Sequence, residues 1–287
     1  MLFGAVVYTK EIANMMLLLS PLLVEGAAFG ALNVLGMFIL EFGLSSHDVE
    51  LLRKREGGKE LHLAGLLATT FNSIILGSIT YAVIMKYCCV DGPLTLLQQA
   101  CSIMMFLIIE NFWYYLAHMA MHTRQLYWMH RFHHKFNVVV LPSSASAVSI
   151  PEFLIAYMAP FVVGSYGTDK SSSIFGAVIV MTSNFIIHTP ALEEVMSHLP
   201  WMFVTPSDHF AHHRQLTLNY GAPLISVDRI VNMLKEYLAF YYSSLSSDKL
   251  EEDGVMESVP SDTSIDDGED SDDSEEADEN TESKKKL

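Results

Sequence analysis

Long apolar blocks, rather than alternating or amphipathic patterns, dominate the first two thirds of this 287-residue chain. A helix needs about 20 apolar residues to cross a bilayer, so such blocks predict membrane-spanning helices. Four blocks stand out, at residues 13–42, 63–87, 94–116 and 153–187. We therefore expect an all-α, polytopic membrane helical bundle.

The fourth block is interrupted by a polar, glycine-containing run at residues 164–170. Turn residues at this place predict a helical hairpin instead of one long helix. Each arm has about 14 to 16 apolar residues, fewer than a full span needs. We expect the arms to cross only part of the bilayer or to pair with each other inside it.

Charge divides the chain into a nearly neutral body and an acidic end. Residues 247–287 hold 17 Asp and Glu against 4 Lys, a net charge of −13 out of −16 for the whole chain. This stretch has few large apolar residues and cannot bury enough surface to fold. We expect a membrane domain over residues 1–246 and a disordered acidic tail over residues 247–287.

Basic residues predict the orientation. They follow the first block (Arg53, Lys54, Arg55 and Lys59) and the third block (Arg124, Arg131 and Lys135). Loops rich in Lys and Arg stay in the cytosol, which makes the N-terminus lumenal and every histidine motif cytosolic, together with the C-terminus. The final Lys284-Lys285-Lys286-Leu287 is similar to a dilysine retrieval signal of the endoplasmic reticulum. The three cysteines predict no disulfide framework.

Histidines carry the candidate chemistry. Nine of the twelve form an H-x-x-x-H pair, two H-x-x-H-H triples and one single position between the triples: His118, His122, His130, His133, His134, His188, His209, His212 and His213. Histidines at i, i+3 and i+4 of a helix share a face, so each run can direct several nitrogens to one point. The set is too large for one four-coordinate ion and predicts two metals.

Several neighbouring residues have roles that the pattern leaves open. Glu110 is an intramembrane acid and a candidate for the shell around the ligands, or an interfacial acid. His198 is either such a residue or structural. We expect His47 and His62 to be structural, and Ser207 or Asp208 to cap the helix that begins before His209.

An all-imidazole dimetal site on a membrane surface is suited to oxidising an unactivated C–H bond of a lipid. Two iron ions with O2 fit this chemistry, because zinc has no redox chemistry. Carboxylate-pair, Ser–His–Asp and phosphate-loop motifs are missing from the sequence, and we expect no nucleic-acid partner.

At these residues the chain resembles the fatty acid hydroxylase superfamily of membrane di-iron oxygenases, which includes sterol C4-methyl oxidases, sterol C5-desaturases and cholesterol 25-hydroxylase-like enzymes. The resemblance covers residues 110–230. It rests on the histidine pair and the first triple with seven residues between them, on His188-Thr189, on the second triple, and on Asn219-Tyr220-Gly221 with Asp228-Arg229.

The resemblance implies a multi-pass oxidoreductase of the endoplasmic reticulum membrane that acts in lipid metabolism. It also implies electrons from NAD(P)H through cytochrome b5, its reductase or a similar carrier. The favoured substrate is a sterol, oxidised by a C4-methyl oxidase or another hydroxylase or desaturase type. Alternatives are a hydroxylase of fatty acyl or sphingolipid chains, and a non-catalytic metal- or lipid-binding membrane protein of the same fold.

The sequence departs from the family pattern at two places. Many members carry His-Pro-x-Glu near the start of the next membrane segment, where this chain has Ser149-Ile150-Pro151-Glu152. Pro190 follows His188-Thr189 at the position where the family usually has Gly or Asn. Both changes preserve the histidines and alter the nearby pocket, so they weaken the inference of the substrate more than that of the family.

Overall fold

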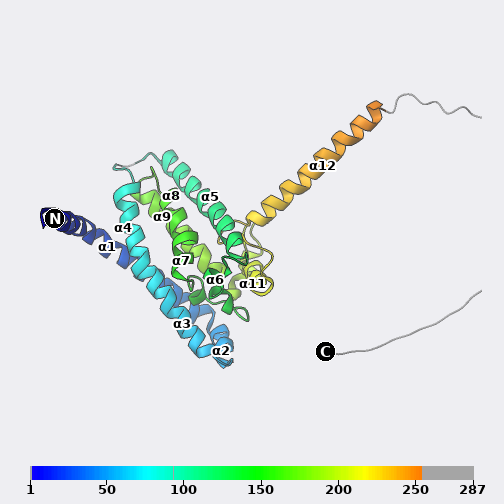
Figure 1. Ribbon diagram of the computed structural model, residues 1–287. Coiled ribbons are helices and arrows are strands. Elements are labelled where there is room, and N and C mark those ends of the chain that lie inside the picture. Colours follow the sequence, from blue (N-terminus) through cyan, green and yellow to red (C-terminus); the bar gives the residue numbers. More distant parts are fainter. Residues whose placement is uncertain (1, 93, 254–287) are drawn as a thin grey trace, which may run out of the picture. The chain divides into compact units, whose positions relative to one another are not determined.

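Apolar helices make up most of the computed structural model, which describes the backbone of residues 2–92 and 94–253 and the side chains of residues 19–92 and 94–244 (Figure 1). In chain order the helices are α1 (Leu2–Leu44), α2 (Ser46–Lys54), α3 (Gly58–Phe71), η1 (Asn72–Leu76), α4 (Gly77–Val83), η2 (Ile84–Cys88), α5 (Leu96–Met121), α6 (Tyr127–His130), η3 (His133–Lys135), η4 (Pro142–Ser144), α7 (Ile150–Glu152), η5 (Phe153–Met158), α8 (Ala159–Gly164), α9 (Lys170–Ile187), η6 (Pro190–Leu192), α10 (Glu193–Met196), α11 (Pro206–Gln215) and α12 (Val227–Asp253). The described residues include no strand, which confirms the all-α prediction.

The chain divides into two units, Met1–Tyr237 and Leu238–Leu287. All the sites discussed below lie in the first unit. In the second, α12 continues as far as Asp253. The rest of the predicted acidic tail lies outside the described residues, and its disorder stays a prediction.

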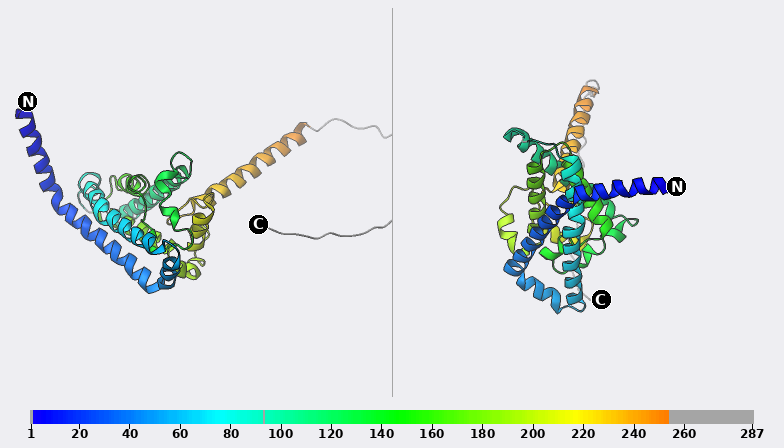
Figure 2. Two further views of the ribbon diagram at one scale, coloured as in Figure 1. Left: turned by 60° about the horizontal axis from the view of Figure 1, so that its bottom comes forward. Right: turned by 90° about the vertical axis from the view of Figure 1, so that its left-hand side faces the viewer.

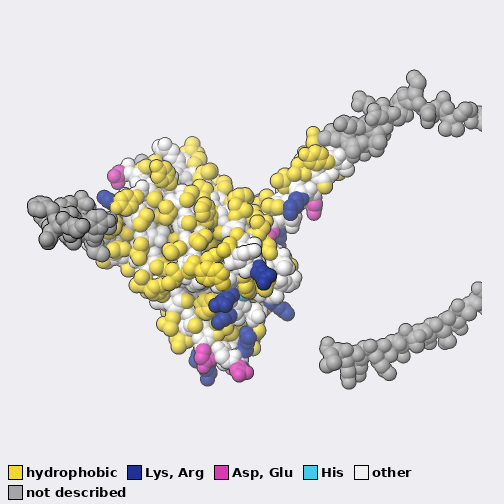
Figure 3. All heavy atoms as spheres, in the orientation of Figure 1, with side chains coloured by type: hydrophobic (Ala, Val, Ile, Leu, Met, Phe, Trp, Pro, Cys, Tyr) yellow, Lys and Arg dark blue, Asp and Glu magenta, His cyan; other side chains and the backbone are white. Residues whose placement is uncertain are grey.

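Four segments are long and apolar enough to cross a membrane: Leu19–Leu44, Gly58–Cys88, Leu96–Met121 and Lys170–Ile187. Only 22% of the most apolar window in the first and third is buried inside the protein, so most of their apolar side chains face outward, as a lipid environment requires. The surface view shows apolar side chains covering the helices, with Lys and Arg gathered toward the end that holds α2 (Figure 3). The multi-pass helical fold is therefore as predicted.

The predicted hairpin is formed by α7–η5–α8 and α9. Its second arm is longer than expected, because the Asp169 carboxylate accepts hydrogen bonds from the backbone N–H groups of Ser171 and Ser172 and so starts the helix at Lys170. With 18 residues, α9 is long enough to span. The first arm, Ile150–Gly164, is the shorter apolar helix that the sequence predicted.

The two ends of the bundle are distinguished by their contacts. At one end, the hairpin turn meets the segment after η2, where the Val90 N–H donates to the Thr168 carbonyl at 2.8 Å and the Gly167 N–H donates to the Cys88 carbonyl at 2.9 Å. At the other end, the side chains of Arg55, Arg131 and Lys135 line one groove. The two basic segments of the sequence therefore share one end, as a common side of the membrane requires.

Close contact between α1 and the second span depends on small residues. A Cβ atom on Gly30 would lie 2.3 Å from the Ser73 carbonyl oxygen, and one on Gly26 would lie 2.7 Å from the Ser78 Cα. These glycines form a G-x-x-x-G pair, which lets helix backbones approach inside a membrane. Figure 2 shows α1 running alongside α3 and α4.

A buried loop, residues 139–148, lies between the spans and connects the first histidine triple to the hairpin. Its carbonyl groups accept hydrogen bonds from helix side chains, including Thr69 to Ser143 at 2.8 Å and Asn184 to Ala145 at 3.0 Å. The Ser143 N–H donates to the Glu41 carboxylate, which also pairs with His62 at 2.6 Å. His62 is thus buried in the structural contact expected of it, and the loop is fixed beside the histidines.

Candidate metal centre

All nine histidines of the predicted set meet at the end of the bundle opposite the hairpin turn. They form two groups, and in each group the candidate ligand atoms lie within 4.8 Å of one another. The first group holds His118, His122, His130, His134 and His212, and the second holds His133, His188, His209 and His213. The groups adjoin, because the ring centroids of His134 and His213 are 4.9 Å apart.

The helices deliver the histidines at their ends. The last turn of α5 carries His118, His122 follows as its C-cap, and His188 is the C-cap of α9. The second triple lies on α11, whose N-cap is Thr205 and not the predicted Ser207 or Asp208. The prediction was wrong because Pro206 takes the first helical position, where its missing N–H costs nothing, and Asp208 completes a capping box from the third.

Each triple is divided between the two groups, contrary to the expectation that a run serves one point. The outer pair of the first triple, His130 and His134, joins the first group, while His133 joins the second. In the second triple the outer pair joins the second group, and His212 crosses to the first. The first triple is not one helix, since α6 ends at His130 and a 3-10 turn begins at His133, so its rings point in two directions.

Imidazole nitrogens approach one another closely in both groups. The Nε2–Nε2 distances are 2.9 Å for His118–His130 and 3.2 Å for His122–His134. In the second group they are 3.0 Å for His188–His209 and 3.1 Å for His209–His213. Two nitrogens bound at right angles to one ion, each about 2.1 Å away, are about 3.0 Å apart.

The other ring nitrogens show that these approaches are not ordinary hydrogen bonds. The Nδ1–H of His118 donates to the Tyr220 carbonyl at 2.8 Å, and that of His130 donates to the Glu152 carboxylate at 2.5 Å. In neutral rings both Nε2 atoms then carry only lone pairs, although they face each other. Such an arrangement is stable around a cation, so the residues present fit a bound metal.

Further contacts orient the rings in the same way. The Nδ1–H of His188 donates to the Asn184 carbonyl at 2.6 Å, and that of His212 donates to the Leu218 carbonyl at 2.7 Å. The buried Nε2 of His212 has no hydrogen-bond partner among the described residues. Contacts of this kind fix which nitrogen is offered to a metal.

Burial keeps the imidazoles neutral. It lowers the pKa of His122 and His134 to about 3 and the pKa of His188 and His212 to about 4. Four other histidines of the two groups also lie outside the membrane-spanning segments. Burial, together with the neighbouring imidazoles, lowers their pKa well below the usual range: His130, His133, His209 and His213. Neutral imidazole is the form that binds metals.

Two further predicted residues lie apart from the histidine groups. His198 is exposed, and its Nδ1 contacts the Glu194 carbonyl at 2.6 Å, so the structure does not bring it to the centre. Glu110 is buried two helical turns before His118 and forms no hydrogen bond with a histidine among the described residues.

Glu152 is the site residue that sequence reasoning missed. It is completely buried and holds His130. The available signal was an acid directly after Pro151, at the start of an apolar segment, where an uncompensated charge is costly.

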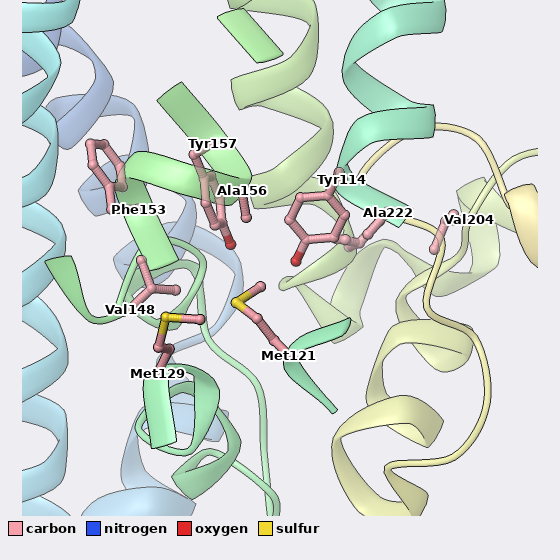
Figure 4. Close-up of a cluster of buried hydrophobic side chains, with 10 residues drawn as sticks. Tyr114, Met121, Met129, Val148, Phe153, Ala156, Tyr157, Val204 and Ala222 are labelled. Atoms are coloured by element: carbon pink, nitrogen blue, oxygen red, sulfur yellow. The ribbon is translucent and has the colours of Figure 1, made fainter. Parts of the chain in front are cut away.

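An apolar cavity lies inside the bundle next to the centre. Its wall includes Phe29, Met85, Phe106, Phe161, Val180 and Phe185. The wall also includes Tyr114, whose ring lies 5.0 Å from that of His118, and Asn184, which holds His188. Figure 4 shows Tyr114 and Tyr157 with Met121 and Met129 near this end. The cavity therefore approaches both histidine groups.

Comparison with known proteins finds sequence similarity in the part of the chain that contains the histidines. Residues 103–233 match the family model described as fatty acid hydroxylase. Over 141 residues the chain is 30% identical to alkylglycerol monooxygenase of Caenorhabditis elegans, a stretch that covers 44% of this chain and 25% of that protein. No solved structure matches the chain. Residues 103–233 contain all nine histidines, so the region that is similar to the fatty acid hydroxylase family is the one that holds both histidine groups.

Proposed function

We propose that this protein is an O2-dependent membrane lipid hydroxylase or desaturase with two iron ions held by the nine clustered histidines. The observation that carries the proposal is the convergence of nine imidazoles into two adjoining groups beside an apolar cavity. The family match and the monooxygenase relative support a membrane lipid hydroxylase. Bound iron would supply O2 activation and oxidation of a C–H bond.

The protein's own residues would bind, orient and exclude water. Glu152 and the carbonyl groups of Asn184, Leu218 and Tyr220 hold four rings with Nε2 directed inward. The apolar wall of the cavity would align a lipid and keep water away from the reacting carbon.

A sterol is the favoured substrate, because the resemblance in the histidine region includes the sterol-oxidising enzymes. An alkylglycerol is the second candidate, supported by the name of the relative. Acyl and sphingolipid chains are further options that substrate profiling would separate.

Electrons would come from NAD(P)H through cytochrome b5 or a similar carrier at the cytosolic face of the endoplasmic reticulum. The groove lined by Arg55, Arg131 and Lys135 supports this arrangement, because it also reaches His134. Cations beside a cluster ligand suit an acidic carrier.

The test measures iron content and lipid-dependent O2 consumption of the purified full chain supplied with reductant. We expect two irons per chain, and we expect His130→Ala and His212→Ala to lose turnover. His198→Ala is the matched control and should retain turnover, because His198 is exposed outside both groups. Retained turnover in both cluster variants, or a zinc-loaded protein without oxygen uptake, would refute the enzyme proposal in favour of a binding protein.

A further inference from the structure

Glu110 places a carboxyl group in the wall of the apolar cavity. The residue is only 1% exposed, and the buried Oε2 atom of its carboxyl group has no hydrogen-bond partner among the described residues. A buried polar group without a partner is costly, by about 1–3 kcal/mol in proteins, and native structures rarely keep one without a role. The carboxyl group therefore needs a partner that enters the cavity.

Several other polar groups in the same wall are already paired. Asn33 donates to Ser73 at 3.3 Å, and Asn184 donates to the Ala145 carbonyl at 3.0 Å. Ser165 and Ser173 bond to each other at 2.5 Å. Glu110 differs from these residues because its hydrogen-bonding capacity remains available to a ligand.

The position of Glu110 relates it to the histidines. Glu110, Tyr114 and His118 are at i, i+4 and i+8 of α5, so they lie along one face of the helix. The two turns between Glu110 and His118 correspond to about 12 Å along the helix axis. Tyr114 lies between them, and its ring contacts the rings of His118 and Tyr157.

We propose that the Glu110 carboxylate accepts a hydrogen bond from a hydroxyl group of the lipid substrate and so determines which carbon lies beside the histidine groups. This inference rests on the proposed function for the presence of a lipid in the cavity. Glu110 is a positioning residue, because it holds the substrate at a distance from the reacting carbon.

The substrate class follows from this contact. A lipid with a hydroxyl group satisfies the carboxyl group, whereas a pure hydrocarbon chain leaves it unpaired. Sterols and alkylglycerols share this chemistry. A separation of about two helical turns favours oxidation at a carbon remote from the hydroxyl group. In a sterol it favours the side chain over a methyl group on the ring position next to the hydroxyl.

The test measures equilibrium binding of tritiated lipids to the metal-free full chain in detergent. Two matched pairs are used: cholesterol with cholest-5-ene, and 1-O-hexadecylglycerol with hexadecyl propyl ether, where the second member lacks only the hydroxyl groups. Wild type should prefer the hydroxylated member of one pair by about tenfold, the effect expected of one good hydrogen bond. The pair that shows the preference identifies the lipid class.

Glu110→Met should reduce the preference to less than twofold, while Glu110→Gln, which still accepts a hydrogen bond, should keep most of it. Tyr81→Phe is the matched control, because it removes a hydroxyl in the same wall that is already paired with Glu25 at 3.3 Å. It should bind like wild type. In turnover, Glu110→Met should broaden the set of oxidised carbons, an effect that general loss of structure would not produce.

The proposal is overturned if Glu110→Met keeps the wild-type preference, if wild type binds both members of each pair equally, or if it binds none of the four lipids. Binding is measured without metal, so its outcome is separate from that of the oxygen-consumption test. A hydroxyl preference without turnover would refute only the enzyme function.

Discussion

Among single residues, Glu152 makes a contact whose removal we expect to affect the proposed metal centre directly. Its carboxylate holds the Nδ1 of His130 and so directs Nε2 toward the first group. We expect Glu152→Ala to weaken iron binding about 10- to 100-fold, the usual cost of losing such a partner. Competitive metal titration of the purified protein would measure the change. Glu152→Gln should lose less, because its amide oxygen still accepts the bond.

Glu60→Gln is the control for this prediction. Glu60 is an exposed acid that lines the groove beside His134, so its loss removes a nearby negative charge without removing a contact with a histidine. An equal loss of affinity in Glu60→Gln and Glu152→Ala would show that net charge, and not the contact with His130, accounts for the effect.

The sequence was sufficient to select the nine histidines, because their spacing is rare and their chemistry is shared. It could not reveal how the triples are divided, because the direction of His133 and His212 depends on the angle between segments distant in sequence. Glu152 was missed for the same reason. Its partner, His130, lies 22 positions away, and no spacing rule connects them.

Among the elements, the contact of α1 with the second span gives a sharp packing prediction. Gly30→Ala would place a methyl group 2.3 Å from the Ser73 carbonyl, and the two backbones would have to separate. We expect a loss of about 1–3 kcal/mol, as in other overpacked sites. Thermal unfolding in detergent would measure it.

Gly36→Ala is the control on the same helix, because a Cβ atom there has nothing within 4 Å. Its unfolding temperature should equal that of wild type or be slightly higher. If Gly30→Ala were as stable as Gly36→Ala, the close approach of the two helices would not be a feature of the protein in its membrane.

The lengths of the apolar blocks predicted the spans and the hairpin, because the thickness of the bilayer sets the length of an apolar helix that crosses it. They underestimated α9, because its first turn holds Lys170 and three serines that a hydropathy block excludes. The Asp169 cap adds this polar turn to the helix. A cap of this kind is defined by side-chain hydrogen bonds, which a hydropathy pattern does not contain.

For the whole molecule, the depressed histidine pKa values predict acid sensitivity of the metal-free protein. Burial lowers the pKa of His188 and His212 to about 4 in the folded protein, against about 6.5 in the unfolded chain. The unfolded chain therefore takes up protons first, and stability present above pH 6.5 is lost as the pH falls toward 4. The melting temperature of the metal-free protein should decline over this range. A flat profile between pH 6.5 and 4.5 would contradict the burial of neutral imidazoles.

Orientation in the membrane is a second property of the whole molecule. The predicted topology places the loop near Asp91 in the lumen and the basic segment around Arg55 in the cytosol. An engineered N-glycosylation site at the first position should be modified in cells, and one at the second should not. The reverse pattern would place the histidines on the lumenal side.

The division of each triple between the groups has a consequence for assembly. The same two short segments contribute to both groups, so an ion bound in one group would fix the backbone that presents the histidines of the other. Most of the conformational entropy of these segments would then be lost when the first ion binds. The second ion should therefore bind more tightly than the first. Loading is expected to be cooperative, with few singly occupied molecules, and damage to one group should lower occupancy of both.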